Sequence, residues 1–314
     1  GDVVQGTLSP LSFIMPSGNF NNQIYSSNLI ILILFYLPYV ITNRKGILIV
    51  GLGVLAVLLA SVMHQVIAFI LSLIITSLLF SASFLKLNLT KLLIAIGVVL
   101  SGLLFAFLQP KNVELISFYA EKITSNNSPK SNVTIESLTM LPEEYPQIYF
   151  VGLGPGQYCS RAGLIGTGKY FGDFKNPKPL PFLSKNITPA LDKYVYKKWE
   201  EVATNVPKYG NSTMSRPFYS ALSIVVEFGF ILSSLMFYYI LKKYFKLKKH
   251  YKYEYRNGNK RIAYVFMASA ILILYYISLS FFENYIEVSQ VIFCGLLLFK
   301  ISHQTDYAIE NSIS

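Results

Sequence analysis

A glycine-rich stretch that contains an arginine is the first feature of this sequence whose chemistry can be stated. The stretch "GLGPGQYCSRAG", residues 152–163, holds four glycines and one proline, and Arg161 lies between the last two glycines. Successive backbone N–H groups of such a loop can form a nest that binds an anion. A guanidinium beside the nest can hold the same anion through two hydrogen bonds. The stretch therefore predicts an anion site.

A second arginine and an acid inside an apolar segment follow further along the chain. Arg216 precedes residues 219–241, and the N-terminus of a helix there would add partial positive charge for an anion. Glu227 would lie roughly 10 Å into that helix, at about 1.5 Å per residue. An ionisable side chain inside a membrane span is costly and is therefore a functional candidate. Each of these residues also has a structural interpretation. Glu227 could instead pair with a neighbouring helix or line a wet cleft. Arg161 and Arg216 could instead be solvated cations of a loop.

The composition indicates which elements must position these residues. Of the 314 residues, 53% are hydrophobic and 14% are charged, well below the roughly 25% charged residues of a soluble domain. The apolar residues occur in long runs, as they do in spanning helices. We therefore expect an all-α polytopic membrane protein with about seven transmembrane helices. The expected helices are residues 28–42, 46–62, 64–80, 91–108, 219–241, 262–279 and 286–301.

Positive charges predict how these helices are oriented. Lys and Arg occur between the first and second helices, between the third and fourth, and in residues 242–261, which hold nine of them against one Glu. The positive-inside rule places these loops in the cytoplasm, where the last one could also bind anionic lipid headgroups. The expected organisation has three parts: 1–108, an extracytoplasmic N-terminal segment and helices one to four; 109–218, one large extracytoplasmic loop domain with short helices; and 219–314, helices five to seven with the basic loop 242–261 and a C-terminal tail.

One helix within the large loop can be placed from its capping residues. In "TPALDKYVYKKWEEV", Thr188 suits the N-cap and Pro189 the first helical position. Leu191, Val195 and Trp199 are four residues apart and form one apolar stripe. Trp199 would suit either the membrane interface or the interior of the loop domain.

The remaining motifs are interpreted mainly as structural. On the third expected helix, His64, Ala68, Ser72 and Thr76 repeat every four residues, and a stripe of small and polar side chains is typical of helix packing. The stretch "GLIGTGKY" resembles a nucleotide-binding loop, but Tyr170 stands where a Ser or Thr would ligate Mg²⁺. The cysteines and histidines have no metal-ligand spacing. We therefore expect no metal and no nucleotide.

Five stretches together resemble a known family of bacterial membrane enzymes. They are "DVVQGTL" with the Asn-rich lead-in to the first helix, "LLASVMHQVIAFIL", "VGLGPGQYCSRAG", "SRPFYSALSIVVEFGFI" and "FFENYIEVSQVIFCGLLL". The third is similar to the G-x-G-P-G-Q-[FY]-x-S-R-A stretch in the large external loop of O-antigen polymerases and ligases. The last is similar to that family's final pair of helices, joined near an acidic residue. The chain thus resembles the C-terminal part of such a protein.

The resemblance implies a glycosyltransferase that polymerises polyprenyl-diphosphate-linked oligosaccharides, which are both donor and acceptor. Glu227 would be the general base, with His64 second, and Arg161 and Arg216 would stabilise the departing diphosphate. The residues expected to bind the diphosphate and glycan are Gly154, Gly156, Gln157, Ser160, Arg161, Lys169 and Arg216. The implied location is the bacterial cytoplasmic membrane. Further partners would be membrane lipids, a flippase and a chain-length regulator, with no cofactor and no nucleic acid.

Departures from the family pattern favour one branch over another. Ligases of the family carry a histidine in the large loop, but residues 109–218 contain none. This favours a polymerase over an O-antigen ligase or a protein O-oligosaccharyltransferase. An earlier Ser-Arg pair of the family is replaced here by "SVMHQ". An alternative of another class is a membrane transporter or flippase, which predicts internal repeats and interrupted helices. We find no repeat, and Pro38 is the one proline within an expected helix.

Overall fold

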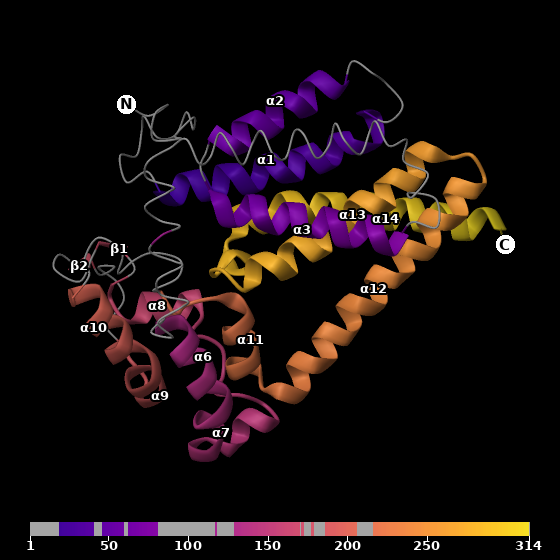
Figure 1. The fold of residues 1–314 in the computed structure, drawn as a ribbon. Coiled ribbons are helices and arrows are strands. Elements are labelled where there is room, and N and C mark those ends of the chain that lie inside the picture. The colour runs from indigo at the N-terminus through magenta and orange to yellow at the C-terminus, as the bar shows by residue number, and fades with distance from the viewer. Residues whose placement is uncertain are drawn as a thin grey trace. The chain divides into compact units, whose positions relative to one another are not determined.

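The computed structural model describes residues 19–40, 46–59, 62–80, 117, 129–169, 171–172, 177–178, 186–205 and 216–313. The regular structure of this part of the chain is helical, apart from one antiparallel pair of two-residue strands (Figure 1). The all-α class predicted from the sequence is therefore confirmed. The chain divides into two compact units, which are described separately. The bundle unit consists of Gly1–Glu114, Ile240–Leu279 and Val288–Ser314, and the loop unit of Leu115–Tyr239 and Ser280–Glu287.

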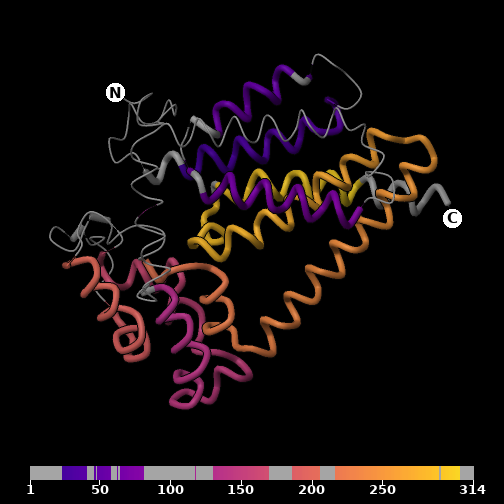
Figure 2. Tube along the Cα trace, in the orientation of Figure 1, coloured from indigo at the N-terminus to yellow at the C-terminus, as the bar shows by residue number. Residues whose placement is uncertain are grey.

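The bundle unit is an assembly of long apolar helices. They are α1 (Asn19–Val40), α2 (Gly46–Leu59), α3 (Met63–Phe80), the later part of α12 (Phe230–Arg256), α13 (Lys260–Ser280) and α14 (Ser289–Ile313). Helix α1 lies beside α2, as Figures 1 and 2 both show, and also contacts α3 and α14. Aromatic rings join α3 to later helices: Phe69 lies 6.2 Å from Tyr275 and Phe80 lies 5.7 Å from Tyr244, measured between ring centroids.

Helix α3 buries a stripe of small and polar side chains and exposes large apolar side chains on its other face. Of the predicted stripe of His64, Ala68, Ser72 and Thr76, the last three residues are fully buried, as the packing interpretation predicts, whereas His64 is partly buried. The Ser72 hydroxyl donates to the carbonyl of Ala68 at 2.6 Å, and the Tyr244 hydroxyl lies 3.4 Å from Thr76 Oγ1. The opposite face exposes large apolar side chains, each between 46% and 65% accessible: Ile67, Leu71, Ile74 and Leu78. Small residues inside and large apolar residues outside are typical of a helix that faces lipid.

In the part of the chain that the structure describes, fewer helices are long and apolar enough to span a membrane than the seven that the sequence predicts. Among the described residues, two segments are long and apolar enough to cross a membrane, Gln23–Val40 and Lys260–Ser280. Shorter apolar helices cover Leu48–Val57, His64–Phe80 and Val291–Gln304. The predicted fourth helix, residues 91–108, lies outside the described residues. The predicted fifth helix, residues 219–241, is two helices in the structure, which are separated at Gly229. Seven spans are therefore not supported, although two helices could cross a membrane.

The loop unit consists of short elements around a compact aromatic core. Its elements are α6 (Pro129–Thr139), α7 (Leu141–Glu144), η3 (Pro146–Tyr149), α8 (Arg161–Gly166), β1 (Phe171–Gly172), β2 (Pro177–Lys178), α9 (Pro189–Leu191), η4 (Asp192–Tyr196), α10 (Lys197–Asn205), α11 (Ser220–Phe228), the start of α12 and η5 (Tyr285–Glu287). The strands pair Phe171 with Lys178 and Gly172 with Pro177. Trp199 is 1% exposed, and its ring lies edge-on to Phe218 at 5.1 Å. The core therefore takes up Trp199, the residue whose place the sequence left open.

The helix predicted at Thr188 is confirmed, including its cap. Thr188 Oγ1 accepts from the Leu191 amide at 3.2 Å, and Pro189 occupies the first position of α9. The helix then continues through η4, a π-helical turn, into α10. The predicted stripe of Leu191, Val195 and Trp199 is buried along its whole length.

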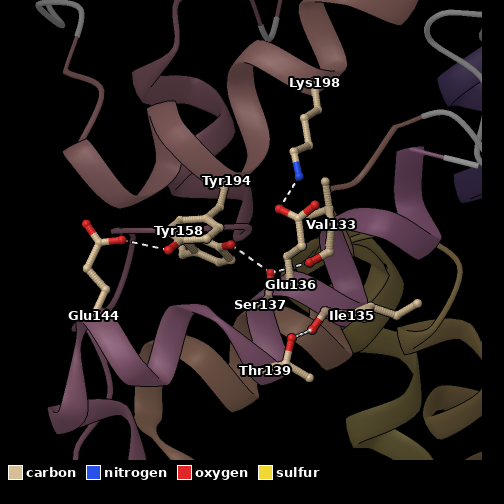
Figure 3. Close-up of polar contacts among 9 residues, drawn as sticks. All are labelled: Val133, Ile135, Glu136, Ser137, Thr139, Glu144, Tyr158, Tyr194 and Lys198. Carbon is tan, nitrogen blue, oxygen red and sulfur yellow. Dashed lines mark hydrogen bonds and ion pairs between the residues drawn. The ribbon is translucent and has the colours of Figure 1, made fainter.

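Side-chain hydrogen bonds connect α6 and α7 to the rest of the loop unit (Figure 3). The hydroxyls of Ser137 and Tyr158 lie 2.7 Å apart, so α6 is joined to the glycine-rich loop. Tyr194 donates its hydroxyl to Glu144 at 2.6 Å, and Lys198 forms an ion pair with Glu136. These contacts hold the glycine-rich loop, which contains Arg161, against the helices of the loop unit.

Candidate functional site

The glycine-rich loop has the backbone conformation that an anion nest requires. The φ angles of Gly152, Gly154 and Gly156 are 76°, 97° and 79°, in the left-handed region that favours glycine. The loop ends at Ser160, whose hydroxyl accepts from the Gly163 amide at 3.2 Å and caps α8. Its amide groups are thereby presented together, as the sequence predicts.

The anion that these amides hold is the carboxylate of Glu227. Oε2 accepts from the Gly156 amide at 2.6 Å, and Oε1 accepts from the amides of Tyr158 and Ser160 at 2.9 and 3.1 Å. Glu227 is 2% exposed, so its charge is satisfied by hydrogen bonds in place of water. The Gly154 amide also has a partner within the chain, the Glu227 carbonyl at 3.0 Å. The amide groups predicted to hold a diphosphate thus hold the end of α11.

Two glycines bring the loop and the helix break into backbone contact. Gly229 has a φ of 82° and separates α11 from α12. A Cβ atom on Gly229 would lie 2.7 Å from both the Gly152 nitrogen and the Phe150 oxygen, and one on Gly152 would lie 2.4 Å from the Glu227 carbonyl carbon. The Leu153 amide donates to the Val226 carbonyl at 2.9 Å. We call this arrangement of residues 150–160 around residues 226–229 the clasp, and it explains why the predicted helix is interrupted.

A second carboxylate, Glu287 in η5, meets the end of the same loop. Its Oε2 accepts from the Arg161 amide at 2.5 Å, and its Oε1 accepts from the Ser223 hydroxyl at 3.1 Å. Burial raises the pKa of Glu287, and the nearby charge of Glu227 acts in the same direction, while the Arg161 charge opposes it. Adjacent amides, those of Ser160 and Arg161, therefore bind different carboxylates. Sequence reasoning missed Glu287, although the acidic turn between the last helices was the available signal.

A partly buried amine lies close to the start of α11. Lys130 donates to the Phe282 carbonyl, and its Nζ lies 4.6 Å from the centroid of the Tyr219 ring. The hydroxyls of Tyr219 and Thr134 are 2.6 Å apart. Burial lowers the pKa of Lys130 to about 8, with the charge of Glu283 opposing the shift. Lys130 and Tyr219 were also missed, because neither has a distinctive sequence context.

The other predicted residues occupy separate places. Arg216 lies before α11, with its guanidinium carbon 5.9 Å from the centroid of the Trp199 ring. The carbonyl of Gln157 accepts from Thr188 Oγ1 at 2.7 Å, and the Lys169 amide donates to Thr167 Oγ1 at 3.2 Å. His64 belongs to the bundle unit, whereas all the others belong to the loop unit. The sharing of one anion by Arg161 and Arg216 stays a prediction.

No known family model, curated protein or solved structure matches this chain. The family resemblance therefore rests on the quoted motifs. Among the described residues, no group of three or more His, Cys, Asp or Glu side chains is arranged to hold a metal ion. The chemistry of the site as described is that of two carboxylates, an arginine and a partly buried amine within one unit.

The shifted pKa of Lys130 predicts a pH-dependent contribution to stability. Because the pKa of Lys130 is about 8 in the folded protein and its ordinary value is 10.5, the unfolded chain binds the proton more tightly between these values, and stability rises with pH across this window. Across the whole window, the shift in the pKa of Lys130 changes the free energy of unfolding by about 3 kcal/mol, at 1.36 kcal/mol per pKa unit. Lys130→Met should remove this rise, measured as the thermal midpoint of the purified protein from pH 7 to pH 10.5.

Lys193→Met is the matched control for this measurement. Lys193 is exposed, and its hydrogen bond with Glu144 raises its pKa, so any contribution to stability is lost as pH rises. The control should therefore keep the rise seen in the wild type. Identical pH profiles for the wild type and Lys130→Met would refute the partly buried position of the amine.

Proposed function

We propose that the protein is a membrane glycosyltransferase that polymerises polyprenyl-diphosphate-linked oligosaccharide repeat units into O-antigen, capsule or exopolysaccharide. The proposed location is the bacterial cytoplasmic membrane, with a multi-pass bundle and an extracytoplasmic loop unit. The observation that carries the proposal is the hydrogen bond from the Arg161 backbone amide to Glu287, an acid of raised pKa on which the Arg161 charge also acts, at the end of the loop that carries the family-like motif. The lipid-facing pattern of α3 supports the membrane location.

The proposed reaction is a displacement at the anomeric carbon of the donor. An acceptor sugar hydroxyl forms the new C–O bond while the bond from the anomeric carbon to the diphosphate breaks, and polyprenyl diphosphate leaves. The hydroxyl proton passes to a general base. Arg161 and Arg216 stabilise the charge that develops on the diphosphate. The activated leaving group supplies the driving force, so the proposal includes no cofactor.

The contacts of the two carboxylates favour Glu287 as the base. Glu227, the residue proposed from the sequence, already accepts three backbone amides and is 2% exposed. Its role in this proposal is to position the loop. Glu287 is less buried, and the raised pKa brings it closer to the neutral range in which general bases act best. Its contact with the Arg161 amide would keep base and cation together.

The interruption at Gly229 is also a feature expected of a transporter, because transporters bind substrates at interrupted helices. Here the carbonyls of Val226 and Glu227, at the end of α11, accept from the amides of Leu153 and Gly154. Those acceptors are thus occupied within the loop unit, which favours a structural clasp over an ion-binding break.

The proposal predicts that Arg161→Ala and Glu287→Gln each abolish chain extension. Loss of one pre-placed electrostatic group typically lowers a rate roughly 10²–10³-fold, and loss of a general base by a similar factor. The variants would replace the wild-type gene in its host, and surface polysaccharide would be resolved by length. We expect a single repeat unit in place of a ladder, with normal amounts of protein in the membrane.

Glu144→Gln is the control, because Glu144 is an exposed loop-unit carboxylate paired with Lys193. It should give the wild-type ladder. Long polymer from both Arg161→Ala and Glu287→Gln would end the proposal. Transfer of glycan to a lipid core sugar or to a protein would favour the ligase branch instead.

A further inference from the structure

An open groove of about 320 Å³ lies on the loop unit. Lysine, hydroxyl and large apolar side chains share its lining: Lys130, Ser131, Thr134, Ile135, Tyr219 and Phe281. The first four come from α6, Tyr219 immediately precedes α11, and Phe281 follows α13. The volume lies at the lower end of the range of about 300–1,000 Å³ for small-molecule pockets. The groove therefore has room for a ligand of the size of one sugar ring.

The aromatic floor of the groove is held in a fixed orientation. The Tyr219 side chain is 5% exposed, and its hydroxyl lies 2.6 Å from Thr134 Oγ1, which donates to the Lys130 carbonyl at 2.6 Å. At the mouth, Ile135 and Phe281 are 60% and 59% exposed. Fixed apolar surface with few polar groups is the usual design of a pocket that orients a ring.

The charge in the groove favours an anionic ligand. The Lys130 side chain is partly buried, and its Nζ lies over the Tyr219 ring. The charged or titratable groups that act on it are Glu283 from the turn after α13, Cys159 from the glycine-rich loop, and Tyr219 itself. A carboxylate in the groove would replace part of the lost hydration of the ammonium.

We propose that this groove binds a sugar residue that carries a carboxylate, with the ring against the exposed side chains of Ile135 and Phe281 and the carboxylate on the Lys130 ammonium. The saccharide class of the ligand rests on the proposed function, while its charge and size rest on the groove alone. In that function the groove, which neither Arg161 nor Glu287 lines, would hold an acidic sugar of the lipid-linked repeat unit.

The proposal predicts selective binding of methyl β-D-glucuronide to the purified full chain in detergent. Saturation-transfer NMR would compare this glucuronide with methyl β-D-glucoside and with inorganic phosphate. The glucuronide should bind at least fivefold more tightly than the glucoside, and phosphate should show no dependence on Lys130. Since only the ammonium pairs with the carboxylate, the affinity should fall about tenfold between pH 7 and pH 9, as the charged fraction of a group of pKa about 8 falls.

Lys130→Met and Phe281→Ala should each weaken glucuronide binding at least fivefold, and Lys193→Met should leave it unchanged. A second measurement uses only the wild-type protein. At pH 8 the glucuronide, but not the glucoside, should slow the acylation of Lys130. The rate of acylation of Lys193 serves as the internal reference. Equal binding of glucuronide and glucoside, or unchanged acylation of Lys130, would overturn the proposal. Phosphate binding that depends on Lys130 would also overturn it, in favour of a simple anion site.

The two proposals fail separately. If glucuronide binds through Lys130 while Arg161→Ala and Glu287→Gln make normal polymer, the groove stands and the polymerase function falls. If those variants lose polymer while the glucuronide does not bind, the function stands and the groove proposal falls.

Discussion

Glu227→Ala should unfold the loop unit, because it leaves two buried backbone amides and a partly buried one without their acceptor. The amides of Gly156, Tyr158 and Ser160 all donate to this one carboxylate. An unsatisfied buried donor costs about 1–3 kcal/mol, and a whole domain is stable by only about 5–15 kcal/mol. Limited proteolysis of membranes that contain the variant should cleave residues 150–160 at least tenfold faster than in the wild type.

The intermediate variant Glu227→Gln tests the same contact more finely. A glutamine oxygen in the place of Oε1 would still accept hydrogen bonds from the amides of Tyr158 and Ser160. The new NH₂ group would face the Gly156 amide, so that two donors would meet. The rate of cleavage should therefore fall between those of the wild type and Glu227→Ala. Glu144→Gln, at an exposed ion pair, should match the wild type, since such pairs contribute about 0–1 kcal/mol.

The result for Glu227→Ala also separates two roles. A variant that resists proteolysis like the wild type, yet makes no polymer, would show that Glu227 is the base that the sequence suggests. A variant that is cleaved rapidly would show that Glu227 positions the loop, as its hydrogen bonds indicate.

The sequence analysis identified the nest but not its occupant. Positive-φ glycines at 152, 154 and 156 follow from the local sequence, because only glycine adopts that backbone readily. A carboxylate and a phosphate have the same hydrogen-bonding demands, so local sequence cannot tell an external anion from a side chain 71 residues away. The tertiary contact decides between them.

The helix break and the second acid were missed for different reasons. Apolar residues continue on both sides of Gly229, so the hydrophobic pattern predicts one helix, and the break depends on the approach of Gly152. Glu287 lies in a short turn, where no periodicity marks a residue as buried. By contrast, the stripes on α3 and on α9–α10 were predicted correctly, because burial there follows helical spacing.

Gly229→Ala should distinguish a broken helix from a continuous one by the sign of its effect. In a continuous helix over residues 219–241, replacing glycine by alanine would stabilise the protein by about 1 kcal/mol. In the clasp, the new Cβ would lie 2.7 Å from the Gly152 nitrogen and the Phe150 oxygen, and the φ of 82° is itself unfavourable for alanine. We expect a loss of at least about 3 kcal/mol, measured as a lower thermal midpoint of the purified protein.

Gly258→Ala is the matched control, because it shares the backbone strain but not the contact. Gly258 has a φ of 85°, and a Cβ atom there would meet nothing within 4 Å. This variant should lose only the conformational cost, about 1 kcal/mol. Equal losses at positions 229 and 258 would contradict the contact between the loop and the break.

The double variant Gly152→Ala/Gly229→Ala tests whether the two glycines act through one contact. Gly152 and Gly229 meet in one backbone contact, so either alanine should already open the clasp. Neighbouring residues that share a contact are not additive, and the second substitution should therefore cost much less than the first. Additive losses would mean that the two glycines act independently. In that case the interruption at Gly229 would have to arise from α11 and α12 alone, and the loop would lose its role in setting where α11 ends.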